Sequence, residues 1–214
     1  MRNLTIAFLF AIAAFCSPAL AARLTLVALG DSLTAGYGLP QGDGFVPQLQ
    51  AFLTAQGQDV TVSNAGVSGD TTAGGLARLD WSLTPDTDAL IVNLGGNDLL
   101  RGLDPAFSAA NLDHILATAR ARHLPVLLVG LRALNNFGPD FKAQFDAIYP
   151  ALAAKYKVPL YPDYFAVLKS DPDQTRSLQK YMQFDGLHPN ADGVARIIGD
   201  LGPHVIDFLK QVAQ

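Results

Sequence analysis

The sequence predicts an α/β protein, folded as a three-layer α/β/α sandwich around a five-stranded parallel sheet. Five apolar runs of strand length alternate with longer segments in which apolar residues recur at helical spacing. The runs are almost uninterrupted, which is typical of strands buried on both faces of a parallel sheet. Right-handed crossovers between such strands place helices on both faces. The five runs are residues 24–29, 60–63, 89–94, 125–131 and 158–161.

Two helices are expected between the later strands. Asp104 followed by Pro105 is typical of an N-cap and a first helical position, so a helix is predicted from there to about His123. Residues 137–156 carry large apolar side chains three and four positions apart. That spacing predicts a helix with one face packed on the sheet.

The end of the chain predicts a long loop and a closing helix. Residues 194–212 form the helical region, which we expect to be interrupted near Gly202 and Pro203. Residues 170–190 are predicted to be the longest irregular stretch. Loops of that length are usually functional, so the region is a candidate part of the site.

Residues 1–21 are predicted to be a cleaved signal peptide. Arg2 gives a positive start, and residues 4–15 form an almost unbroken apolar run before a small-x-small cleavage site. The run is shorter than the roughly 20 residues that cross a bilayer, which argues against an uncleaved anchor. We therefore expect residues 22–214 to form one domain that is periplasmic or secreted.

The composition excludes several catalytic mechanisms and classes of partner. Cys16 is the only cysteine and would leave with the signal, so no disulfide, thiolate nucleophile or Cys-ligated metal is expected. A lipid anchor on Cys16 is disfavoured by the bulky Phe15 before it. All 19 acidic residues are Asp, which excludes mechanisms that need a Glu base. A net charge of −4 makes nucleic acid and anionic lipid surfaces poor partners. We expect a monomer that acts on a small molecule, without a stable membrane anchor.

Short polar motifs stand where predicted strands end and in the last long loop. Loops that follow parallel strands meet at the carboxyl edge of the sheet, where ligands bind in open α/β folds. Residues more than 150 positions apart are thus expected in one cleft. The motifs are Gly30-Asp31-Ser32-Leu33, Gly95-Gly96-Asn97-Asp98 and Asp185-Gly186-Leu187-His188.

Together these motifs supply the parts of a nucleophilic site. Ser32 is the candidate nucleophile, and His188 is the candidate base because a neutral imidazole accepts a proton readily near pH 7. Asp185, three residues earlier, is placed to hold the imidazole tautomer. The alternative for the first motif is an ordinary helix cap, with Ser32 as the capping residue.

Three groups are candidates for an oxyanion hole. The Ser32 N–H lies at a predicted helix start, where developing negative charge is favoured. The Asn97 amide follows two glycines, and Gly69 offers a backbone N–H after the second strand. One such donor contributes about 2.7–4 kcal/mol to transition-state stabilisation. An Asx turn at Asn97 and a simple turn at Gly69 are the alternatives.

These motifs resemble those of the SGNH (GDSL-type) hydrolases, a family named after the residues that are here Ser32, Gly69, Asn97 and His188. The resemblance covers nearly the whole chain after the signal and is strongest with a periplasmic bacterial branch of the family. It implies a flavodoxin-like sandwich, an acyl-serine intermediate and esterase activity toward aryl esters, acyl thioesters and lysophospholipids, with no metal or cofactor. The matching segments are residues 30–37, 68–72, 75–79, 95–98, 100–102, 147–150 and 185–190.

The resemblance also implies a mobile loop beside the acyl chain, here residues 98–104. Leu99, Leu100 and Leu103 are its candidate substrate-binding side chains. Alternatively, two of the three only pack on the next helix. Residues 39–45 and 168–183 depart from the family pattern and could border the cleft, which leaves the preferred acyl length open.

One feature separates the chain from the α/β-hydrolases. Thr34 stands where the Gly-x-Ser-x-Gly motif has its second glycine, so a strained nucleophile elbow is not assumed.

Two other functions use the same residues. A carbohydrate acetyl esterase of the same superfamily would keep the site and change the substrate, although the leucines at 99, 100 and 103 favour a fatty acyl group. A flavodoxin-like binding module would hold a phosphate in the loop of residues 31–34. Asp31 and Asp70 oppose the second alternative because they would repel a phosphate.

Overall fold

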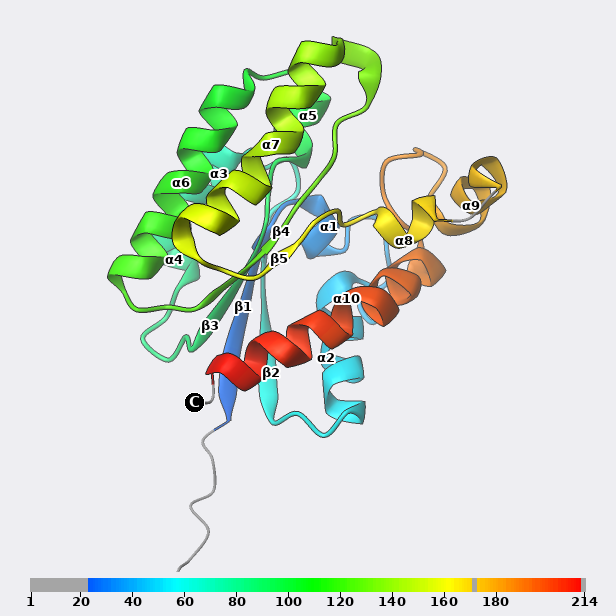
Figure 1. Ribbon diagram of the computed structural model, residues 1–214. Helices are drawn as coiled ribbons and strands as arrows, with labels where there is room; N and C mark the ends of the chain where they lie inside the picture. The colour runs from blue at the N-terminus through cyan, green and yellow to red at the C-terminus, as the bar shows by residue number, and fades with distance from the viewer. Residues whose placement is uncertain (1–22, 171–172, 213–214) are drawn as a thin grey trace, which may run out of the picture.

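The computed structural model describes residues 23–170 and 173–212. A five-stranded parallel sheet, with strand order β2-β1-β3-β4-β5, lies between two layers of helices (Figure 1). The predicted sandwich is therefore confirmed, whereas the predicted signal peptide falls outside the described residues. The strands are β1 (Leu24–Gly30), β2 (Val60–Gly66), β3 (Ala89–Asn93), β4 (Val126–Val129) and β5 (Leu160–Tyr161).

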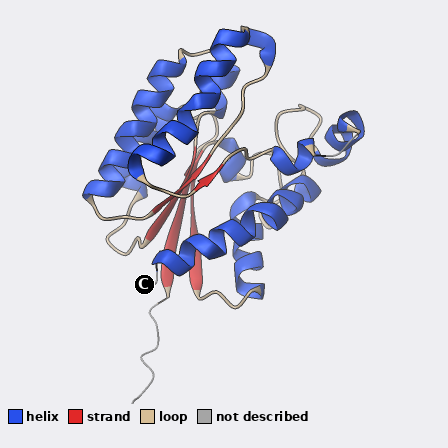
Figure 2. Ribbon diagram, viewed as in Figure 1, coloured by secondary structure: helices blue, strands red, loops and turns tan. Residues whose placement is uncertain are grey.

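Helices α6 and α7 cover one face of the sheet, and α2 and α10 cover the other (Figure 1). Figure 2 shows the same layering by element type, with the strands enclosed between helices. The helices are α1 (Ser32–Ala35), α2 (Phe45–Ala55), α3 (Thr72–Ala77), α4 (Leu79–Ser82), α5 (Gly96–Leu100), α6 (Pro105–Ala121), α7 (Pro139–Tyr156), α8 (Ala166–Lys169), α9 (Gln174–Tyr181) and α10 (Ala191–Val212), with a 3₁₀ turn η1 (Asn135–Phe137).

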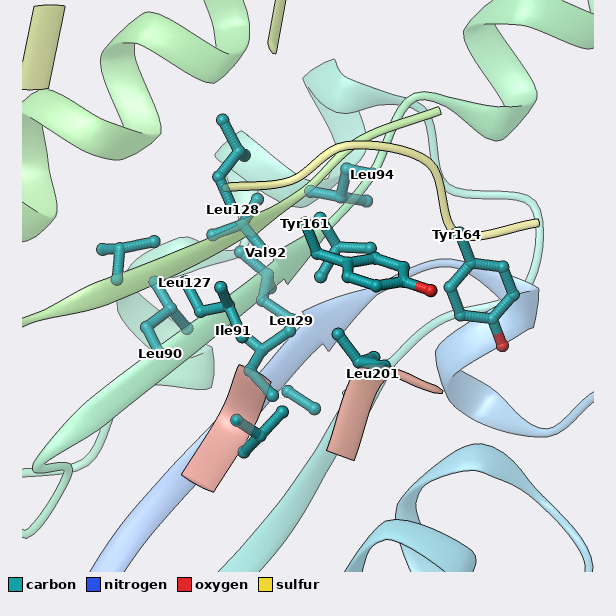
Figure 3. Close-up of a cluster of buried hydrophobic side chains, with 14 of the residues drawn as sticks. Leu29, Leu90, Ile91, Val92, Leu94, Leu127, Leu128, Tyr161, Tyr164 and Leu201 are labelled. Carbon is teal, nitrogen blue, oxygen red and sulfur yellow. The ribbon is translucent and has the colours of Figure 1, made fainter. Parts of the chain in front are cut away.

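The core lies on both faces of the central strands. Leu29, Val92 and Leu128 are fully buried at adjacent positions of β1, β3 and β4. Tyr161 of β5 and Leu201 of α10 belong to the same cluster (Figure 3). Each such side chain contributes about 1.5–3 kcal/mol by burial, so the sheet is a rigid base for the loops at its edge.

Helix α6 begins where the sequence predicts, whereas the last helix, α10, differs from the prediction. The Asp104 carboxylate caps α6 by accepting the Ala106 N–H at 2.9 Å. The expected break at Gly202 and Pro203 is wrong, because α10 runs through both residues. Its apolar stripe is continuous there, and a Cβ on Gly202 would lie 2.3 Å from the Phe52 ring, so tight packing on α2 outweighs the missing proline donor.

Two other expectations need correction. Residues 170–190 are not wholly irregular, since α9 occupies part of them. The Asp173 side chain starts this helix by accepting the Arg176 N–H at 3.0 Å. In the predicted mobile loop, residues up to Leu100 belong to helix α5.

Three strands end level with one another. Gly30, the last residue of β1, pairs with Gly66 of β2 on one side and Asn93 of β3 on the other. The loops after these strands therefore start at the same edge of the sheet. Because those loops carry Ser32, Gly69 and Asn97, the register brings three of the candidate residues into one neighbourhood.

Candidate active site

Ser32 is the first residue of α1, one turn of helix that starts directly after β1. Asp31 is the N-cap, and its carboxylate accepts the Leu33 N–H at 3.0 Å. The alternative in which Ser32 is the cap is therefore wrong, and the serine hydroxyl is left for another partner. Gly66 allows α1 to pack on β2, since a Cβ there would lie 2.3 Å from the Ala35 nitrogen.

Ser32, His188 and Asp185 form a continuous chain of polar contacts. Ser32 Oγ lies 2.8 Å from His188 Nε2, across 156 positions of sequence. His188 Nδ1 lies 2.6 Å from Asp185 Oδ2. The structure thus brings together the predicted nucleophile, base and orienting acid.

Asp185 is held in the ionised form by its own loop. Partial desolvation raises its pKa, but hydrogen bonds from the His188 ring and from the backbone N–H groups of His188 and Leu187 outweigh that effect and lower the pKa to about 2. The two backbone bonds to Oδ1 measure 3.0 and 2.9 Å. The carboxylate can therefore fix the orientation of the imidazole throughout the neutral pH range.

Two residues that sequence reasoning did not select hold the histidine loop against the serine loop. The Gln183 side-chain amide donates to the carbonyls of Tyr37, at 2.8 Å, and Pro189, at 3.0 Å. The Gln183 backbone N–H also donates to the His188 carbonyl at 2.8 Å. The Tyr37 ring lies next to the imidazole at a tilt of 40°, with ring centroids 4.7 Å apart. The sequence does not mark the contact between Gln183 and Tyr37, because it joins segments that are 146 positions apart.

Asn97 and Asp98 join the loops after β2 and β3. The Asn97 side-chain amide donates to the Asp70 carbonyl at 2.9 Å. The buried Asp98 carboxylate accepts both the N–H and the hydroxyl of Thr72, at 2.8 and 2.6 Å, and the Ser108 hydroxyl at 2.9 Å. These bonds fix the start of α5, and hence Asn97, relative to the loop that contains Gly69.

Gly69 lies in an exposed part of that loop. Its φ is 87°, a backbone conformation that residues other than glycine rarely adopt. Arg101 donates to its carbonyl at 2.9 Å. Arg78 connects the loop to the end of β1, because it donates to the Asp70 carboxylate at 2.5 Å and to the Gly30 carbonyl at 2.8 Å. Gly69 is therefore linked both to the end of β1 and to α5.

A cavity of about 370 Å³ opens beside Ser32, Asn97 and His188. Of the three leucines predicted to bind substrate, Leu99 and Leu100 line this cavity, and Leu103 does not. The divergent segment 168–183 contributes to the lining, whereas residues 39–45 do not. The apolar lining residues are Leu33, Leu99, Leu100, Leu131, Leu134, Phe165, Leu168, Leu178, Met182 and Leu187.

Asp31 also lines this cavity, and its pKa is shifted in the opposite direction to that of Asp185. Burial raises its pKa to about 6, although the hydrogen bond from the Leu33 N–H and the nearby His188 lower it in part. The carboxyl is 1% exposed. Burial therefore favours the protonated form of Asp31, close to the nucleophile, while Asp185 stays charged.

Residues 23–170 and 173–212 show neither a metal cluster nor a membrane-spanning helix. No group of three or more His, Cys, Asp or Glu side chains in these ranges is arranged to hold a metal ion. No helix in the same ranges is both long and apolar enough to span a bilayer.

Comparison with known proteins gives a consistent result. Residues 28–196 match the model of the GDSL-like lipase/acylhydrolase family. The chain is 40% identical to esterase TesA of Pseudomonas aeruginosa over 86% of this chain and 88% of that protein. It is 39% identical to thioesterase 1/protease 1/lysophospholipase L1 of Escherichia coli K12, over 80% and 78%. The crystal structure of AlinE4, an SGNH-hydrolase family esterase, superposes with a TM-score of 0.71 at 41% identity, covering 88% of this chain and 98% of that one.

We predict that Asp31→Asn removes part of the pH dependence of stability. The folded protein raises this pKa from 3.8 to about 6, so the contribution of the group is fully present below pH 4 and is lost as the pH rises through about 6. Two pKa units correspond to about 3 kcal/mol. Urea unfolding at pH 4 and pH 7.5 should show the wild type losing about that much more stability than Asp31→Asn, whose amide still caps α1. Parallel pH profiles for the two proteins would contradict the assignment.

Proposed function

The chain belongs to the GDSL-like lipase/acylhydrolase family, and we propose on that basis that Ser32 attacks the acyl carbonyl of esters and thioesters while His188 takes its proton. The observation that carries the proposal is the series of contacts Ser32 Oγ to His188 Nε2, at 2.8 Å, and His188 Nδ1 to Asp185, at 2.6 Å. The ionised Asp185 accepts a hydrogen bond from the Nδ1–H group, which leaves Nε2 as the acceptor that faces the serine.

The reaction then follows in two halves. In the first, the Ser32 oxygen bonds to the acyl carbon, and the proton on His188 passes to the leaving group as the ester or thioester bond breaks. In the second, His188 removes a proton from water as the water oxygen bonds to the acyl carbon. The imidazolium then returns that proton to Ser32 Oγ as the acyl–oxygen bond breaks, which releases the carboxylic acid and restores the free enzyme. All the proton transfers use one imidazole, so no cofactor enters the cycle.

Three donors are proposed to stabilise the oxyanion: the backbone N–H groups of Ser32 and Gly69, and the Asn97 side-chain amide. The Asn97 amide nitrogen carries two hydrogens, and one of them is used in the bond to the Asp70 carbonyl. That bond orients the second hydrogen. Preorganised donors of this kind are effective because they need no rearrangement as charge develops.

Gln183 and Tyr37 are proposed to position His188. Gln183 ties the backbone on either side of the imidazole to the loop after α1, so it sets the separation of His188 and Ser32. The Tyr37 ring and the imidazole are tilted by 40° to each other, with their centroids 4.7 Å apart. An aromatic face favours a cation, so it stabilises the imidazolium that forms during acylation.

The apolar cavity favours a fatty acyl substrate. Relatives of the chain are named arylesterase and thioesterase 1/protease 1/lysophospholipase L1, and we extend these substrate classes to it. A carbohydrate acetyl esterase needs polar groups to bind sugar hydroxyls, whereas most of the lining next to Ser32 is apolar. The flavodoxin-like binding module is set aside, because the relatives named above are enzymes of the same family.

The cellular setting is a further proposal. We assign residues 1–21 to an export signal and residues 22–214 to a single hydrolase domain, which acts in the periplasm or outside the cell, as a monomer. The short apolar run before a small-x-small site supports the first assignment. The family match over residues 28–196 supports the second, because it lies within the proposed domain.

Replacement of Ser32 by Ala is expected to reduce kcat at least about 10³-fold, because the acyl-serine can no longer form. The assay is hydrolysis of p-nitrophenyl esters with acyl chains of two to sixteen carbons. The wild type should show kcat/KM rising from the acetyl ester toward medium chains, as the apolar cavity fills. Undiminished turnover by Ser32→Ala would overturn the mechanism, and activity confined to the acetyl ester would favour the carbohydrate esterase.

Replacement of Gln183 by Ala is expected to lower kcat about 10- to 100-fold with little change in KM, because His188 loses its alignment with Ser32. Gln48→Ala is the matched control. The Gln48 amide also bridges two backbone carbonyls, those of Asp43 at 2.7 Å and Ala191 at 3.0 Å, neither of which belongs to a candidate catalytic residue. Steady-state kinetics and thermal unfolding should show similar losses of stability and a kcat effect only for Gln183→Ala. Equal effects on kcat would mean that Gln183 acts only through stability.

A further inference from the structure

The cavity beside Ser32 carries a local charge opposite to that of the whole chain. Its charged lining residues are Asp31, Arg132 and Lys169. Asp31 is buried at 1% exposure and its carboxylate caps α1, whereas the Arg132 and Lys169 side chains are 50% and 42% exposed. A substrate that enters the cavity therefore meets two accessible cations and no accessible carboxylate among the lining side chains, although the chain has a net charge of −4.

Arg132 is only loosely paired within the protein. Its guanidinium lies 3.7 Å from the Asp146 carboxylate. Asp146 has closer partners, since it accepts from the Lys142 ammonium at 2.7 Å and from the Ala133 N–H at 2.8 Å. Among residues 23–170 and 173–212, Arg132 makes no other ion pair. A guanidinium has five N–H donors, so Arg132 keeps most of its hydrogen-bonding capacity for a ligand.

Lys169 is already paired within the protein. Its ammonium donates to the Asp163 carboxylate at 2.8 Å and lies 5.8 Å from the centre of the Phe165 ring. Asp163 is largely buried, so this pair is fixed at the end of α8. The Asp163 carboxylate offsets much of the Lys169 charge, so Lys169 adds only a small part of the local potential and Arg132 makes the direct contact.

The side chains around the two cations are apolar. Leu131 and Leu134 flank Arg132 in sequence, and Phe165 and Leu168 precede Lys169. Coulomb attraction strengthens where apolar groups exclude water, and Arg pairs with carboxylate or phosphate in a bidentate manner. The ligand that fits is an amphiphile that has both an acyl chain and an anionic group.

We propose that Arg132, assisted by Lys169, binds an anionic group of the substrate and makes the enzyme prefer anionic amphiphilic acyl esters to neutral ones of equal chain length. The inference rests on the proposed esterase function. The anion is a carboxylate or phosphate, carried either at the far end of the acyl chain or on the leaving group. The net negative charge of the chain does not oppose this preference, because a cation in contact with the ligand outweighs distant charges screened by salt.

Three chromogenic esters separate the two positions of the anion. They are p-nitrophenyl octanoate, which is neutral, mono-p-nitrophenyl suberate, which carries a carboxylate at the acyl end, and 3-carboxy-4-nitrophenyl octanoate, which carries one on the leaving group. Measuring kcat/KM for wild type and variant on all three cancels the intrinsic reactivity of each ester. The readout is the ratio of anionic to neutral kcat/KM.

Arg132→Gln is expected to lower this ratio about tenfold or more for one of the anionic esters, which identifies the end that Arg132 binds. Arg132→Lys should retain part of the ratio, and Lys169→Gln should lower it less than Arg132→Gln does. Arg122→Gln is the matched control. Arg122 pairs with Asp80 and precedes β4, at the opposite edge of the sheet, so its replacement should leave the ratio unchanged.

The results that would contradict the inference differ from the result that would contradict the proposed function. An unchanged ratio in Arg132→Gln for both anionic esters, or an equal fall on all three esters, would overturn the inference while Ser32→Ala remained inactive. Hydrolysis of the neutral ester by Ser32→Ala would instead overturn the proposed function and the inference with it.

Discussion

The hydrogen-bond contact between Ser32 and His188 joins two loops from opposite ends of the chain, and the candidate site depends on that junction. On one side, Ser32 is fixed by the sheet: β1 ends beside Gly66 and Asn93, and the Asp31 cap starts α1 at once. On the other side, the loop that carries His188 follows α9 and touches the serine loop through Gln183 and Tyr37. A rigid base and a few polar bonds therefore set a distance of 2.8 Å. The chemistry that we propose follows from that distance.

The site uses one type of acid in three different environments, in a chain that has no Glu. Asp185 accepts several hydrogen bonds, which lower its pKa to about 2 and keep it charged beside His188. Asp31 is desolvated, and its pKa rises to about 6. Asp98 is also buried, but three donors from Thr72 and Ser108 satisfy it and let it join neighbouring loops. The burial of each carboxylate and the groups that donate to it, rather than the residue type, decide its role.

The fold was predictable because strong local patterns agree with it, and the site was predictable only in part. Apolar runs place the five strands, and the Asp104-Pro105 pair marks the start of α6. The continuity of α10 was missed because packing of Gly202 on Phe52 overrides the local preference of Pro203. Gln183 and Arg132 carry no motif, since their importance comes from contacts made only after folding. The cavity wall near residues 168–183 was anticipated only as a divergent segment, because no period in the sequence shows where its side chains point.

The proposed chemistry depends on activation of Ser32 by His188, and covalent labelling tests this activation most directly. The protein is treated with a fluorophosphonate, and peptide mass spectrometry gives the site and rate of phosphonylation in the wild type and in His188→Ala. We expect one label per chain, on Ser32, with a rate that falls at least about 10³-fold without the imidazole. A label on another residue, or an equal rate in His188→Ala, would contradict the claim that this contact creates the nucleophile.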